Sequence, residues 1–365
     1  MFREGTLRVA GALLLLVLAA GCVSKAPIWV GFVAELTGKR GQLGVDARDG
    51  AQLAVDMINE QGGIAGRSVQ LLVRDDKGDP EIARQMDAAL VEQGVVAIIG
   101  HTTSGQAAAV FEQINAAEVV LLSPGASSEQ FSGQADYFFR ALPTTDLMGG
   151  ALAWHIYYNC NVRDLVCVYD ENNRSYGEFF WQAVQAKFEA LGGKAGHLFT
   201  FTPDETALDA LMMQVQAVEP EGVVFIASPV DTALMVQYGH QQGLNARLFS
   251  SPWAQSDALL EKGGQAVEGL EMIAGYTPQT PYPPSQRFAE QFEARYGRQP
   301  TLLASNGYEA VLVLAYALKQ TRGQRQGLPE ALVRVKDLEG AYSPISLDEY
   351  GDARRDVYIA RVKDR

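Results

Sequence analysis

The chain has 365 residues, of which 47% are hydrophobic and 20% charged, and its formal net charge is −13. This length suits two lobes better than one core, and the composition is that of an ordinary globular protein. The acidic balance, with no cluster of Lys and Arg, argues against a nucleic-acid surface, because such a surface must neutralise phosphates.

The N-terminal segment differs from the rest of the chain. Two arginines precede an apolar run at 9–20, which ends in Leu18-Ala19-Ala20-Gly21-Cys22. This pattern predicts a secretory signal peptide that is too short to span a bilayer as a mature helix, and no other run approaches transmembrane length. One interpretation of this segment is an ordinary cleaved signal peptide followed by a cysteine that is there by chance.

The residues before Cys22 resemble the bacterial lipoprotein box, although Ala19 stands where that box usually has Leu. The resemblance implies a lipoprotein signal peptide at 1–21, lipidation of Cys22 and a tether at 22–27. The exported chain would then sit at the periplasmic face and meet the membrane through its lipid anchor only.

From residue 28 onward, short apolar strands alternate with helical segments. We predict strands at 28–33, 69–73, 95–99 and 119–122, separated by helices at 45–61, 80–93 and from 106 onward. After residue 143 the same rhythm restarts, with strands at 165–169, 197–201, 222–226, 247–250 and 270–274. The helices of this second half are expected at 148–158, 178–191, 205–218 and 231–242, and three more follow at 285–296, 303–321 and 328–335. This rhythm predicts two α/β units with parallel sheets and right-handed crossovers.

Two predicted strands end in short loops of hydroxyls and glycines. The strand at 95–99 leads into residues 100–105, and the strand at 119–122 leads into residues 123–128. In an open α/β sheet, loops of this kind at helix starts bind small polar or anionic ligands. We therefore predict that residues 95–128 form one wall of a ligand cleft.

Cys160 and Cys167 both belong to the exported part of the chain, where disulfides are permitted. One is expected near a helix end and the other within a strand, so that a bridge between them is geometrically allowed. Free buried cysteine is as good an interpretation, and the sequence leaves both open.

Catalytic and cofactor chemistry find little support. His101 and Ser104 are neighbours, but no Gly-x-Ser-x-Gly elbow is present, and the four histidines lack metal-ligand spacing. The glycine-rich stretch at 38–44 matches neither nucleotide-binding fingerprint. We expect no enzyme activity, no cofactor and no metal.

Six strings, in the right order, carry a family resemblance: 47–54 with 58–64, 75–80, 99–101, 123–126, 175–177 and 305–310. Over residues 28–362 the chain resembles the type I periplasmic solute-binding proteins, specifically the branched-chain amino acid (Leu/Ile/Val) binding family of ABC transporters. The resemblance implies two doubly wound, Rossmann-like lobes joined by three hinge crossings, near 140–145, 273–277 and 341–347. Lobe one would be 28–141 with 275–342, and lobe two 145–272 with 346–365. A ligand would bind in the cleft between the lobes, which close on it.

The resemblance also implies site residues. A ligand carboxylate would be held by Ser104, with Thr103 beside it, and by Ser127 with the backbone of Gly125 and Ala126. Neutral donors at helix starts suit an anion; the alternative is that Ser104 and Ser127 are only helix N-caps. Tyr176 matches a family tyrosine that closes over the ligand; its alternative is a surface aromatic packed on Phe179.

The sequence departs from the family pattern on the facing wall. Trp253 stands where an acid should pair with a ligand ammonium, and Leu43 stands where an aromatic is usual. A buried ammonium needs a compensating charge, and Trp253 would offer an aromatic face in its place. Other acids that could substitute are Glu35, Asp231 and Asp257.

The sequence thus predicts a monomeric, lipid-anchored solute-binding protein. It would capture an amino acid-like or small carboxylate ligand and deliver it to the permease subunits of an ABC importer. The alternative is a sensory binding protein of the same fold that reports an amide or aromatic acid to a receptor.

Overall fold

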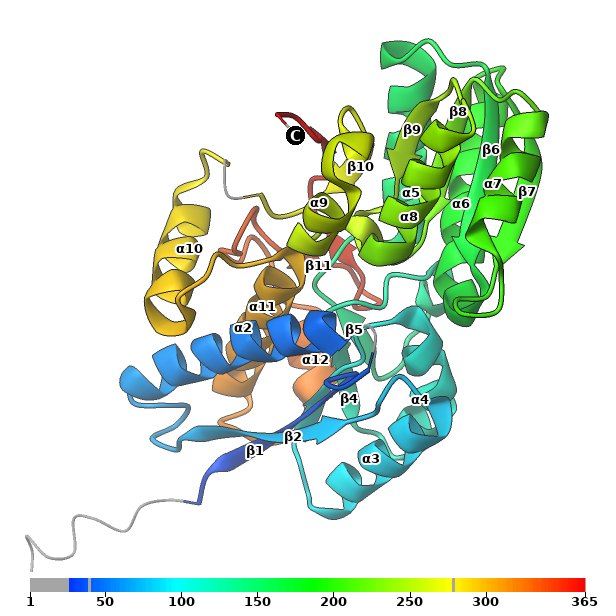
Figure 1. Cartoon of the computed structure of the whole chain (residues 1–365). Coiled ribbons are helices and arrows are strands. Elements are labelled where there is room, and N and C mark those ends of the chain that lie inside the picture. The colour runs from blue at the N-terminus through cyan, green and yellow to red at the C-terminus, as the bar shows by residue number, and fades with distance from the viewer. Residues whose placement is uncertain (1–25, 39–40, 278–279, 365) are drawn as a thin grey trace, which may run out of the picture.

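The computed structural model describes residues 26–38, 41–277 and 280–364 (Figure 1). The predicted signal peptide, Cys22 and most of the tether lie outside the described residues. Within these ranges no helix combines the length and the apolar character needed to cross a bilayer.

The first lobe is built on a parallel sheet in the order β2-β1-β3-β4-β5. Its strands are β1 (Ile28–Ala34), β2 (Val69–Asp75), β3 (Ala97–Ile99), β4 (Val120–Ser123) and β5 (Phe138–Arg140). Alternate residues of β1, β3 and β4 enter two cores, one on each face of the sheet. Both faces are buried, which explains the nearly continuous apolar runs in the sequence.

Helices cover both faces of this sheet. One face carries α2 (Gly41–Glu60), α10 (Pro283–Tyr296), α11 (Leu302–Gln320) and α12 (Leu328–Leu332). The other carries α3 (Pro80–Glu92) and α4 (Ser104–Ala116). Helices α2 and α11 pack backbone against backbone, since a Cβ on Gly307 would lie 2.0 Å from the Ala47 carbonyl oxygen.

The second lobe has a six-stranded sheet in the order β13-β10-β9-β8-β6-β7. Its parallel strands are β6 (Asp164–Asp170), β7 (Lys194–Phe201), β8 (Gly222–Ile226), β9 (Arg247–Ser250) and β10 (Glu271–Ala274). The edge strand β13 (Tyr358–Arg361) runs antiparallel to β10. The core on one face is formed with α5 (Thr145–Trp154) and α6 (Arg174–Ala190). The core on the other face is formed with α7 (Leu208–Ala217), α8 (Pro229–Gln241) and α9 (Asp257–Gly263).

The predicted fold class is confirmed: the chain forms two doubly wound α/β lobes (Figure 1). The first crossing lies between β5 and α5, and the second follows β10. The third crossing differs from the prediction. The short strands β11 (Ser346–Leu347) and β12 (Ala353–Arg354) pair with each other, and Leu347 and Ala353 are buried in the core of the first lobe. Residues 346–355 therefore pack with lobe one, and the chain passes to lobe two only between Arg355 and β13.

Two buried arginines hold this hairpin on the first lobe. Arg140 Nε donates to Asp352 Oδ1 at 2.8 Å, and Arg355 Nη1 donates to Glu309 Oε2 at 2.6 Å. The Arg355 guanidinium also lies 3.6 Å from the centre of the Tyr342 ring. Because the side chains of Arg355 and Glu309 are both fully buried, each requires the other as its counter-charge.

The two lobes contact each other where α4 of the first lobe meets α6 of the second. The backbone N–H of Gly105, at the start of α4, donates to Asn173 Oδ1 of the second lobe at 3.1 Å. The structure thus shows the lobes in contact, with a cleft enclosed between them.

Candidate functional site

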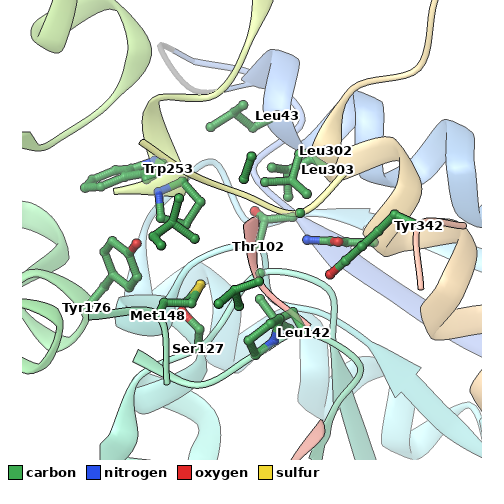
Figure 2. Close-up of a pocket in the computed structure, with 18 of the residues that line it drawn as sticks. Leu43, Thr102, Ser127, Leu142, Met148, Tyr176, Trp253, Leu302, Leu303 and Tyr342 are labelled. Atoms are coloured by element: carbon green, nitrogen blue, oxygen red, sulfur yellow. The ribbon is translucent and has the colours of Figure 1, made fainter. Parts of the chain in front are cut away.

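A cleft lies between the lobes at the carboxyl ends of their strands (Figure 2). The space that no atom fills is about 670 Å³, including its opening to solvent. The first lobe contributes Leu43, Thr102, Gly125, Ser127, Leu302, Leu303, Asn306 and Tyr342 to the lining. The second lobe contributes Met148, Asn173, Tyr176, Pro252, Trp253, Ile273 and Ala274. The crossings add Leu142, Pro143, Gly275 and Val357.

The floor of the cleft on the first lobe comes from the loops after β3 and β4. These loops approach so closely that a Cβ on Gly125 would lie 2.2 Å from the Thr102 carbonyl oxygen. Only glycine fits there without moving the backbone. The close approach places Ser127 at the cleft, and the Ser127 carbonyl accepts the N–H of Thr145, which opens α5, at 2.8 Å.

Two of the hydroxyls predicted to hold a carboxylate serve the loops themselves. Thr103 is the N-cap of α4, and its Oγ1 accepts the N–H of Gln106 at 3.3 Å. Ser104 Oγ accepts the N–H of Ser128 at 3.2 Å, and both serines are buried. Neither Thr103 nor Ser104 is among the residues that line the cleft. Thr102, one or two positions earlier in the loop, is the residue that reaches it.

The predicted backbone donors are also engaged. The N–H groups of Gly125 and Ala126 both donate to Ser123 Oγ, at 3.1 and 2.7 Å. Gly125 lines the cleft, whereas Ala126 is buried in the core behind it. The loop after β4 is therefore held rigidly from inside by one serine.

The second lobe offers an aromatic wall. Tyr176 lies in the first turn of α6, and Trp253 lies in the 3₁₀ turn Pro252–Ala254 that follows β9. Their rings meet edge to face, with centroids 5.8 Å apart and planes at 89° (Figure 2). Burial raises the pKa of the Tyr176 phenol, an effect that the Ser251 hydroxyl partly offsets. The phenol is therefore a neutral group at physiological pH.

The wall from α11 was not predicted from the sequence. Leu302 and Leu303 open this helix, and Asn306 lies one turn further on. Asn306 Nδ2 donates to the Pro124 carbonyl at 3.0 Å, while its buried Oδ1 has no hydrogen-bond partner within the described residues. The string at 305–310 contributed to the family resemblance, but its apolar pattern is that of an ordinary core helix and does not indicate a cleft residue. Nothing in the local sequence around Tyr342 indicated a cleft residue either.

Among the described residues, the cleft is lined by uncharged side chains. None of these lining residues is Asp, Glu, Lys, Arg or His. Glu35, Asp231 and Asp257, the acids considered as substitutes, are not among the lining residues, and Asp231 instead accepts from Ser228 Oγ at 2.6 Å near the start of α8. The cleft can thus enclose apolar groups and offer hydrogen bonds from hydroxyl and amide groups, but its described lining residues provide no counter-ion for an ammonium.

His101 is a structural group and not a catalytic one. Its Nδ1 lies 2.8 Å from Asp76 Oδ2 and its Nε2 lies 3.3 Å from Asp87 Oδ2, and all three side chains are buried. Burial alone would lower the pKa of this imidazole, but the carboxylates of Asp87 and Asp76 outweigh it and raise the pKa to about 10. Both ring nitrogens are occupied, so none is left to activate Ser104 as a nucleophile.

The two cysteines are both free and buried, so of the two interpretations the unbridged one holds. Cys167 lies within β6 and is fully buried in the core of the second lobe. The Cys160 sulfur instead faces His155 and Glu271.

Comparison with known proteins identifies the family. The periplasmic binding protein family model matches residues 27–365, and the chain belongs to that family. A Leu/Ile/Val-binding protein homolog from Brucella melitensis is 25% identical over 352 residues, which are 96% of this chain and 94% of that protein. The predicted family is thereby confirmed, and the similar proteins include ones named as Leu/Ile/Val-binding.

Solved structures share the fold. A substrate-binding protein of an ABC transporter from Desulfitobacterium hafniense, in complex with Leu, is 26% identical with a TM-score of 0.77, over 93% of this chain and 98% of that one. A solute-binding protein of an ABC transporter from R. palustris, in complex with benzoate, is 19% identical with a TM-score of 0.84, over 92% and 93%.

Proposed function

We propose that this protein captures a small, largely apolar carboxylate or amide in the cleft between its lobes and delivers it to the permease of an ABC importer. The observation that carries this proposal is that the described residues lining the cleft are all uncharged, with Trp253 in the position where an acid was expected. The similar proteins described above support the transport role, and the residues that line the cleft support the class of ligand.

The cleft chemistry separates two kinds of ligand. A carboxylate can be bound by neutral donors, and the hydroxyls of Ser127 and Thr102 are the groups placed to provide them. An α-ammonium buried in the same space would lack a counter-charge, which carries a large desolvation cost. A ligand without a charged amino group is therefore favoured over an α-amino acid of the same shape. The fold itself accepts either kind, since one solved relative holds Leu and another holds benzoate.

Aromatic and apolar groups are expected to fill the rest of the cleft. The edge-to-face pair of Tyr176 and Trp253 would pack on the ligand from the second lobe, and Leu43 with Leu303 would pack on it from the first. Because such a ligand touches both lobes, its binding favours the closed arrangement. The amide oxygen of Asn306 would accept a hydrogen bond from a ligand N–H.

A thermal-shift panel tests this proposal. Leucine, 4-methylpentanoate, 4-methylpentanamide and phenylacetate are added to the purified protein. The first three share one carbon skeleton and differ in their polar groups: leucine carries an ammonium and a carboxylate, 4-methylpentanoate a carboxylate alone, and 4-methylpentanamide a neutral amide. A binding ligand at 100 times its Kd should stabilise the protein by about 2.7 kcal/mol and raise its Tm. We expect 4-methylpentanoate to produce a larger shift than leucine, and Ser127→Ala to reduce it.

The control is Ser127→Ala without ligand. Its Tm should match that of the unliganded wild type, because Ser127 Oγ makes no hydrogen bond within the described residues. If no member of the panel raises the Tm, the proposed ligand class is wrong.

A further inference from the structure

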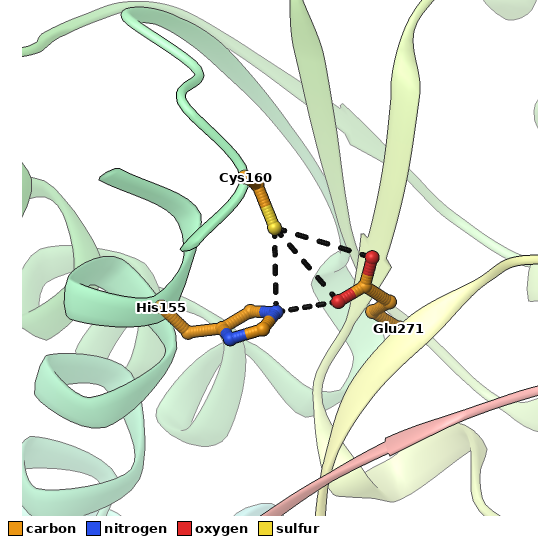
Figure 3. Close-up of side chains that lie close together, drawn as sticks. All are labelled: His155, Cys160 and Glu271. Atoms are coloured by element: carbon orange, nitrogen blue, oxygen red, sulfur yellow. Dashed lines mark hydrogen bonds and ion pairs between the residues drawn. The ribbon is translucent and has the colours of Figure 1, made fainter. Parts of the chain in front are cut away.

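A cluster of three donor atoms lies in the second lobe, away from the cleft (Figure 3). His155 Nε2 lies 2.5 Å from Glu271 Oε2 and 3.3 Å from Cys160 Sγ, and that sulfur lies 3.8 Å from Glu271 Oε2. Glu271 opens β10, so the cluster sits at the opposite end of that strand from the cleft residue Ala274. None of these three residues contributes to the proposed ligand site.

A π-helical turn brings two of the three donors together. Helix α5 continues into the π turn His155–Asn159, and the N–H of Cys160 bonds to the carbonyl of His155, five residues earlier. On an α-helix, residues five apart point in different directions, whereas an i to i+5 turn places them one above the other. Such turns are rare and frequently occur at functional sites.

The three side chains are arranged as ligands around one ion and not as a Cys-His-Glu catalytic relay. In a Cys-His-Glu relay, the thiol and the carboxylate must contact different ring nitrogens. Here both contact the same nitrogen, Nε2, and Figure 3 shows the three donor atoms converging. The other ring nitrogen, Nδ1, lies 3.0 Å from the amide nitrogen Nδ2 of Asn159. For His155 to bind an ion through Nε2, the Asn159 amide must turn over so that its oxygen accepts a hydrogen bond from Nδ1–H. That arrangement leaves the Nε2 lone pair free for an ion.

The remaining side chains position the carboxylate. Arg247 Nη2 and Arg361 Nη2 both donate to Glu271 Oε1, at 2.6 and 2.8 Å, so that Oε2 is the oxygen turned toward Cys160 and His155. Outer hydrogen bonds of this kind commonly orient metal-ligating carboxylates. Both arginines are about half exposed, and the His155 side chain is 13% exposed, so an ion can reach the cluster from solvent.

We propose that His155, Cys160 and Glu271 bind one zinc ion, with a fourth position open to water. Thiolate, imidazole and carboxylate are the ligands that zinc prefers. Tetrahedral zinc with ordinary bond lengths separates its donor atoms by about 3.4–3.6 Å. The two distances to sulfur are within a few tenths of an ångström of this range, and binding must replace the hydrogen bond between His155 and Glu271. The ion would join the π turn that follows α5 to β10, the strand that leads to the second crossing.

Cobalt substitution tests the site, because Co²⁺ reports thiolate ligation by absorption. The full chain is stripped with a chelator, titrated with Co²⁺ and then with Zn²⁺. We expect one Co²⁺ per chain, with a thiolate charge-transfer band that Zn²⁺ removes. Cys160→Ser should abolish the band, whereas Cys167→Ala and Cys22→Ser, which remove thiols elsewhere, should keep it.

Two further variants measure the other donors. His155→Ala should weaken Zn²⁺ binding by more than about 100-fold, since even outer-shell substitutions cost 10–100-fold. Asn159→Ala, which leaves every proposed ligand in place, should weaken it by about tenfold. The proposal is overturned if no thiolate band forms, if Cys160→Ser retains the band, or if Zn²⁺ binds His155→Ala as tightly as the wild type.

Discussion

At the scale of single residues, the contact between Gly125 and Thr102 makes the sharpest stability prediction. Gly125→Ala should destabilise the protein by about 1–3 kcal/mol, because the new methyl group meets backbone that must shift. Gly150→Ala is the matched control: Gly150 lies within α5, and a Cβ there has no atom within 4 Å. That substitution should stabilise the protein by about 0.4–1 kcal/mol. Urea unfolding of both variants measures the difference, and equal effects would contradict the packing described for the loops.

His101 makes a prediction about pH. Its pKa rises from 6.5 to about 10 on folding, so the folded protein binds an extra proton between these values. The stabilisation is complete below pH 6.5 and is lost as the pH rises toward 10. The free energy of unfolding should therefore fall between pH 7 and 9, by up to about 1.4 kcal/mol per pH unit for one proton. Urea unfolding at several pH values would contradict the assignment if stability were constant or rising over this interval.

The residue scale also shows what sequence could and could not reveal about the site. Leu43, Gly125, Ser127, Tyr176 and Trp253 do line the cleft, at the positions to which the family resemblance pointed. Ser104 and Thr103 do not, because which side a loop residue faces depends on hydrogen bonds such as that from Ser128 to Ser104. The cluster at His155 could not be predicted from the sequence, because His155 and Cys160 are five residues apart and come together only on a π turn.

At the scale of elements, the hairpin of β11 and β12 depends on the buried pair of Arg355 and Glu309. Arg355→Met should cost about 3–5 kcal/mol, because it leaves the Glu309 carboxylate buried without a counter-charge. Arg354→Met provides the control, since Arg354 is 80% exposed and lies 3.8 Å from Asp348. Its effect should stay below about 0.5 kcal/mol. Similar losses in the two variants, measured by denaturant unfolding, would be inconsistent with a buried ionic anchor.

The elements differ in how well the sequence predicted them. The sheets and most helices follow from alternating apolar segments, which is a local signal. The third crossing was misplaced because β11 and β12 have two residues each, and the apolar residues Leu347 and Ala353 do not indicate which lobe they enter. The hairpin is assigned to the first lobe by tertiary contacts, among them the hydrogen bond from the Arg140 N–H to the Gly351 carbonyl.

At the scale of the whole molecule, export and anchoring remain a proposal that rests on residues 1–22. We expect the wild-type protein to fractionate with membranes and to be released by detergent. Cys22→Ala should yield a chain that either is soluble after export or keeps its signal peptide, because lipid can no longer be attached. Membrane fractionation and intact mass of the purified chain measure this. A mature wild-type chain without added lipid mass would contradict the anchor.

The central claim concerns how the two lobes together select a ligand. The first lobe would supply neutral donors and the second an aromatic wall, so that a carboxylate without an ammonium fits and an α-amino acid does not. Placing an acid at Trp253 should reverse this preference, because the new carboxylate would face the ligand across the cleft.

Isothermal titration of the wild type and Trp253→Asp with 4-methylpentanoate and leucine is the most direct test. The wild type should bind 4-methylpentanoate at least about tenfold more tightly than leucine, a difference of about 1.4 kcal/mol. Trp253→Asp should lose affinity for 4-methylpentanoate and shift the ratio toward leucine. A wild-type protein that prefers leucine, or a ratio that Trp253→Asp leaves unchanged, would contradict the account.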